Sequence, residues 1–488
     1  MDYDGKRLPP VRVAIVGGGI TGAVAASTLL DAARTGFAEE GQPRLVVELF
    51  DQGRRGPGGR ASHRIVSPED HLTVLPDDDT PGPPSSLEFD HGCQFFRASE
   101  ERTRRLVHAW CAHGWAAEWK GKFGGAPDVD FFGLTSHATE PVYVGRGGMH
   151  RLPRSVLADA KARHPDGLVV HAGVRVASVR SDGGSGGGGG GEAAATWTLL
   201  GTSGTAAFHD TAEADAAKAE PTVLGAGFDA VLLTDASSAF GEWHRASAGL
   251  PAEFAARVRE RVRVPLFSTM VAFDRPLHLT YDAITFRDEA IWFAARTQSK
   301  PGLEASGAPG GVECWTLVST PGFAVAEISA VPMQDAKTGA FKPQEDGYLN
   351  TGPAPALLEA FQRHAARLRS EEGGDGGSPP PAPKLLYLQG QRWGSALPAC
   401  AAHHGRDRSG AGPTTSTVCG VRYEQELLPL VYDRPDAAGD ETDFIADDAR
   451  GLYYAGDFCS HRCPGFETAA LSALDAAEHI SERFLRGR

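Results

Sequence analysis

The stretch VRVAIVGGGITGAVAASTLLDAA, residues 11–33, decides the fold of the amino-terminal part of the chain. A short apolar run, a glycine-rich turn and an alanine- and leucine-rich segment predict a buried strand followed by a helix. A second apolar run, PRLVVELFD (43–51), predicts another strand. Strand, helix and strand in this order predict two parallel strands joined by a right-handed crossover.

The turn carries three glycines in the spacing Gly17-x-Gly19-x-x-Gly22. Gly17 permits the tight turn, Gly19 lets the backbone approach a diphosphate, and Gly22 lets helix and strand pack closely. Ile20 and Thr21 stand at the expected helix N-terminus, where N–H groups and the helix dipole favour phosphate. The turn therefore predicts a dinucleotide site.

The second strand ends on Asp51, which is placed to hold a ribose hydroxyl, and Gln52 follows it in the predicted cofactor site. The acid lies further along the chain than the usual spacing of about 20 residues. The additional segment TGFAEEGQP (35–43) after the helix accounts for the longer spacing.

Composition limits the class of protein. The 488 residues exceed what one simple core holds, so we expect two domains, or one domain with a large insertion. The net charge of −14 argues against nucleic acid or an anionic membrane as the main partner. Seven scattered cysteines suit a reducing compartment. No run of about 18 apolar residues predicts a transmembrane helix, and the start MDYDGKRLPP has no signal-peptide pattern, so we expect a cytoplasmic protein.

Domain boundaries follow from changes in composition along the chain. We expect the first domain to take three segments, 10–75, 143–240 and 447–488, and the second to take 76–142 and 241–446. The runs 168–180 and 195–200 predict a hairpin whose tip is the glycine run. Stretches rich in glycine, alanine, proline and serine predict flexible insertions at 183–195, 203–227, 370–384 and 403–420.

Motifs after the second strand separate flavin from nicotinamide binding. GRRGPGGRASHR (53–64) contains Gly58-Gly59-Arg60, which resembles the GG-R motif of flavoproteins with two dinucleotide-binding domains. There the glycines allow close backbone approach, and the forked guanidinium of Arg60 can contact the diphosphate. FDHGCQFF (89–96) resembles the DxGAQY segment that passes the flavin ring in renalases and their relatives. This resemblance places Gln94 and Phe95 against the cofactor.

Further stretches that resemble motifs of the renalase family, a relative of the flavin amine oxidases, follow in order. They are YVGRGGMHRLPRSVL (143–157), GVRVASV (173–179), RTQSKPGL (296–303), GQRWGSALP (390–398) and AGDFCSHRCPGFETAALSAL (455–474). The resemblance implies an adenine contact at Val176. In the last motif it implies cofactor contacts from Gly456, Asp457, Gly465, Phe466 and Glu467. Asp457 would accept a hydrogen bond from a ribityl hydroxyl.

The resemblance implies an α/β fold with a discontinuous Rossmann-type FAD-binding domain and a second domain with a mixed or antiparallel sheet, like p-hydroxybenzoate hydroxylase and amine oxidases. It implies FAD and oxidation of a dihydronicotinamide, in particular isomeric NAD(P)H, to NAD(P)+. Of non-covalent binding and attachment of the flavin through a cysteine, we favour non-covalent binding. Electrons would pass through the flavin to dioxygen, giving hydrogen peroxide. Phe95 replaces the family's tyrosine, Cys93 its alanine and Gly394 a bulkier residue, so the substrate stays open.

Two alternatives remain open. One is a flavin amine oxidase or desaturase of the same fold, and the other is a catalytically idle FAD- or nucleotide-binding protein. Arg392 and Trp393 are substrate-site candidates, expected to line the site opposite the flavin. Lys300 is a third candidate, as a catalytic lysine, a substrate-phosphate contact or, the reading we favour, a surface residue.

Cys459-x-x-x-Cys463 with His461 could be read as a metal or redox site. Zinc sites usually have four ligands, and no second pair stands at suitable spacing. We interpret the two cysteines as turn residues and predict no metal site.

Overall fold

The structure is a computed structural model of the chain. The residues that it describes are 9–35, 44–53, 55–76, 82–83, 85–126, 141–182, 196–203, 220–235, 238, 243, 246–251, 254, 263–307, 311–332, 345, 347–372, 383–398, 416–418, 421–423, 442–460 and 465–485.

The chain divides into two units, each built from separated segments. The first comprises Met1–Gly59, Pro153–Val262 and Arg434–Arg488, and the second comprises Arg60–Leu152 and Arg263–Asp433. Each unit is made of the same number of segments, in the same order along the chain, as the corresponding expected domain. The boundaries between the segments fall at different residues.

The first unit is built on a six-stranded sheet with β1 near its middle. In sheet order the strands are β20 (Phe444–Asp447), β21 (Leu452–Ala455), β12 (Ala230–Leu233), β1 (Val11–Val16), β2 (Leu45–Asp51) and β8 (Leu168–Ala172). All neighbours are parallel except β20 and β21. The parallel pair predicted from 11–33 and 43–51 is confirmed, and the unit has a Rossmann-type architecture.

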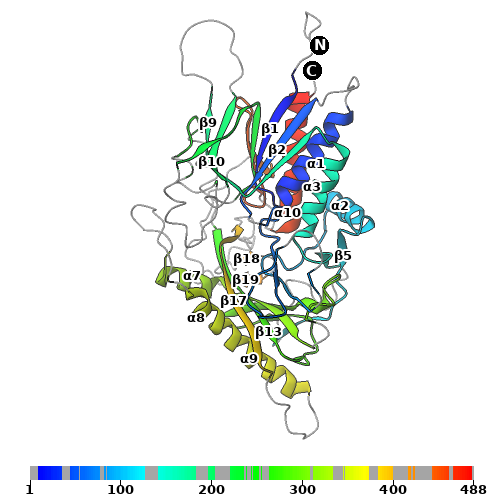
Figure 1. Ribbon diagram of the computed structural model, residues 1–488, viewed down its shortest axis with the longest axis vertical. Coiled ribbons are helices and arrows are strands. Elements are labelled where there is room, and N and C mark those ends of the chain that lie inside the picture. The colour runs from blue at the N-terminus through cyan, green and yellow to red at the C-terminus, as the bar shows by residue number, and fades with distance from the viewer. Residues whose placement is uncertain are drawn as a thin grey trace, which may run out of the picture. The chain divides into compact units, whose positions relative to one another are not determined.

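Helices and a smaller sheet complete this unit. The helices are α1 (Ile20–Thr35), α10 (Phe466–Leu485) and most of α3 (Arg151–Arg163). Figure 1 shows α1, near the start of the chain, lying along α10, near its end. The smaller sheet is antiparallel and contains β9 (Val174–Ser181), β10 (Trp197–Ser203) and β11 (Thr222–Phe228). Trp197 and Phe228 from it join the core beneath β1 and β2.

The hairpin predicted from 168–180 and 195–200 is confirmed between β9 and β10. The run 168–180 is not wholly one arm of it, however. It divides at Gly173, whose φ of +68° lies in the left-handed region. The first part, β8, pairs with β2 in the large sheet, and the second part, β9, pairs with β10 in the small one. The polarity pattern does not reveal such a change of sheet, because both halves are equally strand-like.

Regular structure also lies within segments that we expected to be flexible insertions. β11 occupies part of 203–227, where its residues pair with β10 through an irregular register. The helix α9 (Pro353–Glu372) enters 370–384, and β18 (Ser416–Val418) lies in 403–420. The insertion 183–195 lies outside the described residues.

The second unit contains a mixed six-stranded sheet, as the resemblance implied. In order, its strands are β17 (Leu385–Pro398), β13 (Arg263–Phe273), β16 (Glu313–Ser319), β15 (Ile291–Arg296), β14 (Ala283–Phe286) and β6 (Phe123–Ala126). The neighbours are antiparallel except β14 and β6.

Both faces of this sheet are covered. Residues of α9 and α7 (Pro321–Ala330) form one core with one face, and the ribbon of β3 (His63–Val66) and β4 (Leu87–Asp90) forms a second core with the other. The shorter elements are α2 (Glu101–Ala112), β5 (Ala116–Glu118), β7 (Tyr143–Gly145), η3 (Thr297–Ser299), α8 (Tyr348–Thr351) and β19 (Val421–Tyr423). Within the described part of the chain, no helix has the length and apolar character needed to cross a membrane.

Candidate functional site

The glycine turn of the first unit is fixed by the ends of two strands. The Gly17 N–H donates to the Phe50 carbonyl at the end of β2 over 2.8 Å. The Thr234 hydroxyl, just beyond β12, donates to the Gly17 carbonyl over 3.0 Å. Gly17 has a φ of +108°, which a residue with a side chain adopts only under strain. The turn is therefore held in one shape before any ligand arrives.

Gly22 and Gly19 serve different purposes. A Cβ on Gly22 would lie 2.0 Å from the Gly17 carbonyl oxygen, so only glycine lets α1 start against the turn. A Cβ on Gly19 would have its nearest neighbours, Gly58 and Gly59, at 3.9 Å. The second glycine stretch thus lies beside the first, and Gly19 has space in front of it. This is the clearance that a diphosphate requires.

Asp51 holds the same turn from the side of β2. Its two carboxylate oxygens accept the N–H groups of Gly18 and Gly53 over 2.8 and 2.9 Å. Burial raises the pKa of Asp51, while these hydrogen bonds and the Arg154 guanidinium act in the opposite direction. The neighbour of Asp51, Gln52, is exposed.

Arg154, in α3, was missed by the sequence analysis. Its guanidinium donates to the carbonyls of Pro57, over 2.9 Å, and Arg55, so it fixes the loop before Gly58 and Gly59. No local pattern marks this residue, because nearly 100 positions separate it from the loop that it holds.

The closing motif places Asp457 at the end of β21, where it is 2% exposed. The preceding Gly456 N–H donates to the Ser472 hydroxyl of α10 over 2.8 Å, which ties the strand end to the helix. Gly465 directly precedes α10, and Phe466 and Glu467 form the start of its first turn. Cys459 is buried; Cys463 and His461 lie outside the described residues.

Val176 is buried in β9. Its carbonyl accepts the indole N–H of Trp243 over 3.3 Å. The first unit thus brings Gly17, Gly19, Gly58, Gly59 and Asp51 together, and holds Val176 on its smaller sheet.

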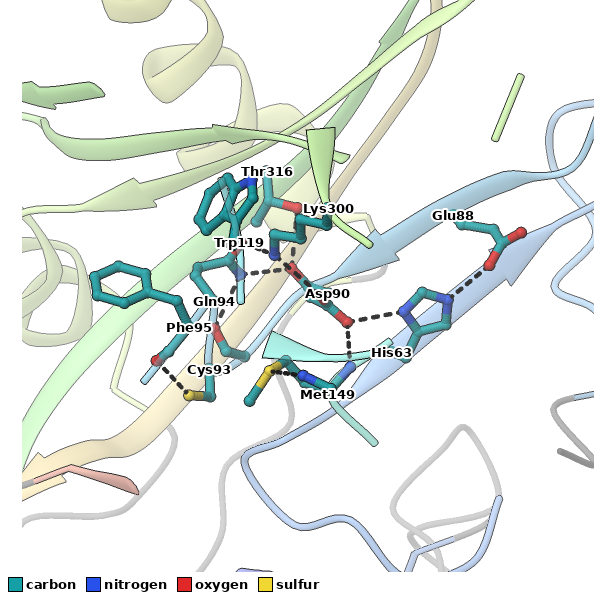
Figure 2. Close-up of polar contacts among 12 residues, drawn as sticks. His63, Glu88, Asp90, Cys93, Gln94, Phe95, Trp119, Met149, Lys300 and Thr316 are labelled. Carbon is teal, nitrogen blue, oxygen red and sulfur yellow. Dashed lines mark hydrogen bonds and ion pairs between the residues drawn. The ribbon is translucent and has the colours of Figure 1, made fainter. Parts of the chain in front are cut away.

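In the second unit, a buried polar network surrounds Asp90 (Figure 2). One carboxylate oxygen accepts the Lys300 ammonium over 2.9 Å. The other accepts the His63 Nδ1–H over 2.9 Å and the Met149 N–H over 2.8 Å. His63 Nε2 lies 3.2 Å from a Glu88 oxygen. Lys300 is 2% exposed, so the expectation of a surface lysine is wrong.

The four ionisable groups alternate in charge. Burial alone would lower the pKa of His63, but its hydrogen bonds to Asp90 and Glu88 outweigh burial and raise the pKa to about 9. Burial acts to raise the pKa of Asp90, yet Lys300 and His63 together hold it below its usual range. At neutral pH, two cations and two anions therefore balance one another inside this unit.

The turn after Asp90 carries the residues that the resemblance places against the cofactor. The Gln94 amide Nε2 donates to the carbonyls of Asp90 and Gly92 over 2.5 and 3.0 Å, and its Oε1 lies 3.2 Å from Lys300 Nζ. The Phe95 ring is tilted against the rings of Trp119 and Phe293. Gln94 and Lys300, 206 positions apart, are thus brought together.

Arg392 and Trp393 do not share a face. Neighbouring residues of a strand point to opposite sides of a sheet. Arg392 pairs across with Phe267, which belongs to the core on the α9 side. Trp393 donates its indole N–H to the His91 carbonyl on the β3–β4 side, over 2.9 Å. The strand therefore directs these two candidates to opposite faces of the sheet.

Arg60 is also engaged within the second unit. Its guanidinium donates to the carbonyl of Ala396, near the end of β17, over 2.8 Å. The sequence analysis singled out neither Asp90 nor His63, although both lie within or beside quoted motifs.

A family profile and several solved structures are similar to this chain. The profile of the NAD(P)-binding Rossmann-like domain matches residues 15–110. A search of curated protein sequences found no significant match. Cyclohexylamine oxidase from Brevibacterium oxydans IH-35A is similar in structure with 13% identity and a TM-score of 0.48, over 97% of this chain and 99% of that one.

Two further solved structures are similar. The p-nitrophenol 4-monooxygenase PnpA from Pseudomonas putida DLL-E4 has 12% identity and a TM-score of 0.41, over 99% of this chain and 82% of that one. The flavin-dependent halogenase CmlS has 13% identity and a TM-score of 0.41, over 99% of this chain and 60% of that one.

Proposed function

We propose that the chain is an FAD-dependent oxidoreductase that oxidises a dihydronicotinamide dinucleotide, in particular an isomeric form of NAD(P)H, to NAD(P)+. The observation that carries the dinucleotide part is the first unit's turn, where Gly19 lies open beside Gly58 and Gly59. The resemblance of the ordered motifs to the renalase family supports flavin and the substrate class.

The residues present fit FAD. The first turn of α1 contains no acidic residue, so its N–H groups and dipole are available to a diphosphate. Gly17, Gly19 and Gly22 would hold the diphosphate, and Asp51 a ribose hydroxyl. Asp457 would hold a ribityl hydroxyl, and Gln94 and Phe95 would lie against the ring.

Bound FAD would supply the redox chemistry, taking a hydride from the dihydronicotinamide and passing two electrons to dioxygen, which with two protons becomes hydrogen peroxide. The chain's own part is to bind and orient. The shape of the glycine turn is preset by Phe50, Asp51 and Thr234, so little ordering remains to be done on binding.

The experiment mixes the purified protein, loaded with FAD, anaerobically with partly isomerised NADH, ordinary NADH and a panel of amines. We expect loss of the oxidised flavin absorbance fastest with the isomerised NADH. Reduction by an amine alone would replace the proposal with an amine oxidase. A protein that binds no flavin at all would refute both enzymes and leave the idle nucleotide-binding protein.

Asp457→Ala is expected to weaken FAD retention by roughly ten- to a hundredfold, because a hydrogen bond to a charged group contributes about 1.5–3 kcal/mol. The measurement is the FAD dissociation constant from flavin fluorescence. Asp448→Ala is the matched control. That carboxylate also lies in the closing segment, but it pairs with His479 over 2.8 Å. Equal retention in both variants would contradict the placement of Asp457.

A further inference from the structure

The turn 90–95 is clamped by side chains of the second unit. The Asp90 carbonyl accepts the Thr316 hydroxyl over 3.0 Å, and the His91 carbonyl accepts the Ser268 hydroxyl over 2.6 Å. The Cys93 N–H donates to the Arg60 carbonyl over 2.8 Å. A loop whose backbone is bound at this many points has few conformations left.

The Gln94 side chain belongs to this clamp. Both hydrogens of an amide nitrogen can donate, and here the two acceptors are the carbonyls of Asp90 and Gly92. The amide oxygen faces Lys300. Gln94 is 7% exposed, so its amide is anchored in the interior of the unit.

Lys300 is held from three sides. Its ammonium donates to Asp90 and Gln94, and it lies 5.4 Å from the centroid of the Trp119 ring. A lysine offers three donors and no acceptor, and two of these donors are occupied inside the protein. The side chain of Asp90 is fully buried, so neither charge is shared with water. Figure 2 shows the Lys300 ammonium beside the Asp90 carboxylate and the Gln94 side chain.

We propose that Asp90 and Lys300 are positioning residues: their buried ion pair fixes the Gln94 amide and so sets the turn 90–95, which the proposed function places against the cofactor. This rests on the proposed function for the identity of the ligand. Lys300 acts through Gln94 and does not itself exchange protons with the substrate. His63, bound to the second oxygen of Asp90, keeps the carboxylate oriented.

Cys93 reports on the turn independently of flavin. Its thiol donates to the Phe95 carbonyl over 3.3 Å within the turn. Burial raises the pKa of Cys93 to about 11, so the reactive thiolate is scarce in the closed turn. Cys93 is half-buried in the turn. We expect a loosened turn to expose the thiol further and to accelerate its alkylation.

The experiment measures the alkylation rate of Cys93 by mass spectrometry of its peptide, with and without added FAD. The variants are Asp90→Asn, Lys300→Met and Gln94→Leu, each checked for folding by circular dichroism. We expect all three to accelerate labelling at least tenfold, and Lys300→Met/Gln94→Leu to be no faster than either single variant. If one of the three variants does not fold, the other two variants still test the proposal.

The matched control is Asp282→Asn. Asp282 is also buried in the second unit, pairs with Arg296 and accepts the Lys122 N–H over 2.8 Å. The Asp282→Asn variant should leave the rate of Cys93 labelling unchanged. Wild-type labelling in folded Lys300→Met and Asp90→Asn, or equal acceleration in Asp282→Asn, would overturn the proposal.

The absorbance spectrum of bound flavin distinguishes a direct contact between Lys300 and the ligand from an effect of Lys300 that passes through Gln94. In the FAD-loaded protein, Lys300→Met and Gln94→Leu should shift the resting flavin spectrum in the same way. A shift in Lys300→Met that Gln94→Leu lacks would show that Lys300 contacts the ligand itself, which also overturns the proposal. A wild type without flavin affinity would refute the proposed function, while the labelling pattern would still decide the role of the ion pair.

Discussion

Gly22→Ala is expected to abolish FAD retention and to lower the free energy of unfolding by about 3 kcal/mol. The added Cβ would lie 2.0 Å from the Gly17 carbonyl oxygen, far inside van der Waals contact. That oxygen belongs to a backbone fixed by Phe50 and Thr234, so it cannot rotate away as a side chain does. The measurements are urea unfolding and the ratio of flavin to protein after gel filtration.

Gly19→Ala is the matched variant within the same turn. Its Cβ would have no neighbour closer than 3.9 Å, so stability should stay near that of the wild type. FAD retention should nevertheless fall tenfold or more, because the methyl group occupies the space in which the diphosphate approaches the backbone. Gly394→Ala, with no atom near its Cβ, should change neither property. A stable, flavin-loaded Gly22→Ala protein would contradict the assigned geometry.

Raising the pH from 6 to 10 is expected to remove about 3 kcal/mol from the stability of the second unit through His63 alone. Its pKa is about 9 in the fold, against an ordinary 6.5, because Asp90 and Glu88 hold the proton. A raised pKa means that the folded state binds the proton more tightly. The stabilisation is therefore complete below pH 6.5 and disappears as the pH rises through 9.

The measurement is urea unfolding at a series of pH values, followed by tryptophan fluorescence. His63→Gln should be less stable than the wild type at pH 6. Its free energy of unfolding should fall much less than that of the wild type between pH 6.5 and 9.5. His113→Gln, which changes an exposed histidine, should retain the wild-type decline. Parallel curves for wild type and His63→Gln would show that the histidine is not protonated in the fold.

The first unit could be predicted from sequence because its signals are local. Strand, glycine turn and helix lie within 11–33, and steric constraints at Gly17 and Gly22 leave little freedom in their arrangement. Reliance on local patterns also explains why the whole run 168–180 was assigned to one arm of a hairpin. A single glycine redirects the chain from one sheet to another there, and nothing in the apolar pattern records which partner each half takes.

The network in the second unit could not be predicted. Lys300 and Asp90 are 210 positions apart, and a lone lysine beside a turn has the same appearance whether it is buried or exposed. The aspartate within FDHGCQFF belonged to a quoted motif, yet only the fold shows that its charge is compensated. Arg392 and Trp393 could have been separated earlier, because strand alternation alone assigns adjacent residues to opposite faces.

The contact between α1 and α10 has a consequence for synthesis of the chain. The helix α1 packs against α10, which is synthesised much later, and β1 lies in the same sheet as β21. At about 5–20 residues per second, the roughly 430 residues between the two helices take about 20–90 s to translate. Throughout that time the apolar face of α1 lacks its final partner. The nascent chain is therefore expected to depend on chaperones that shield α1 until α10 is made.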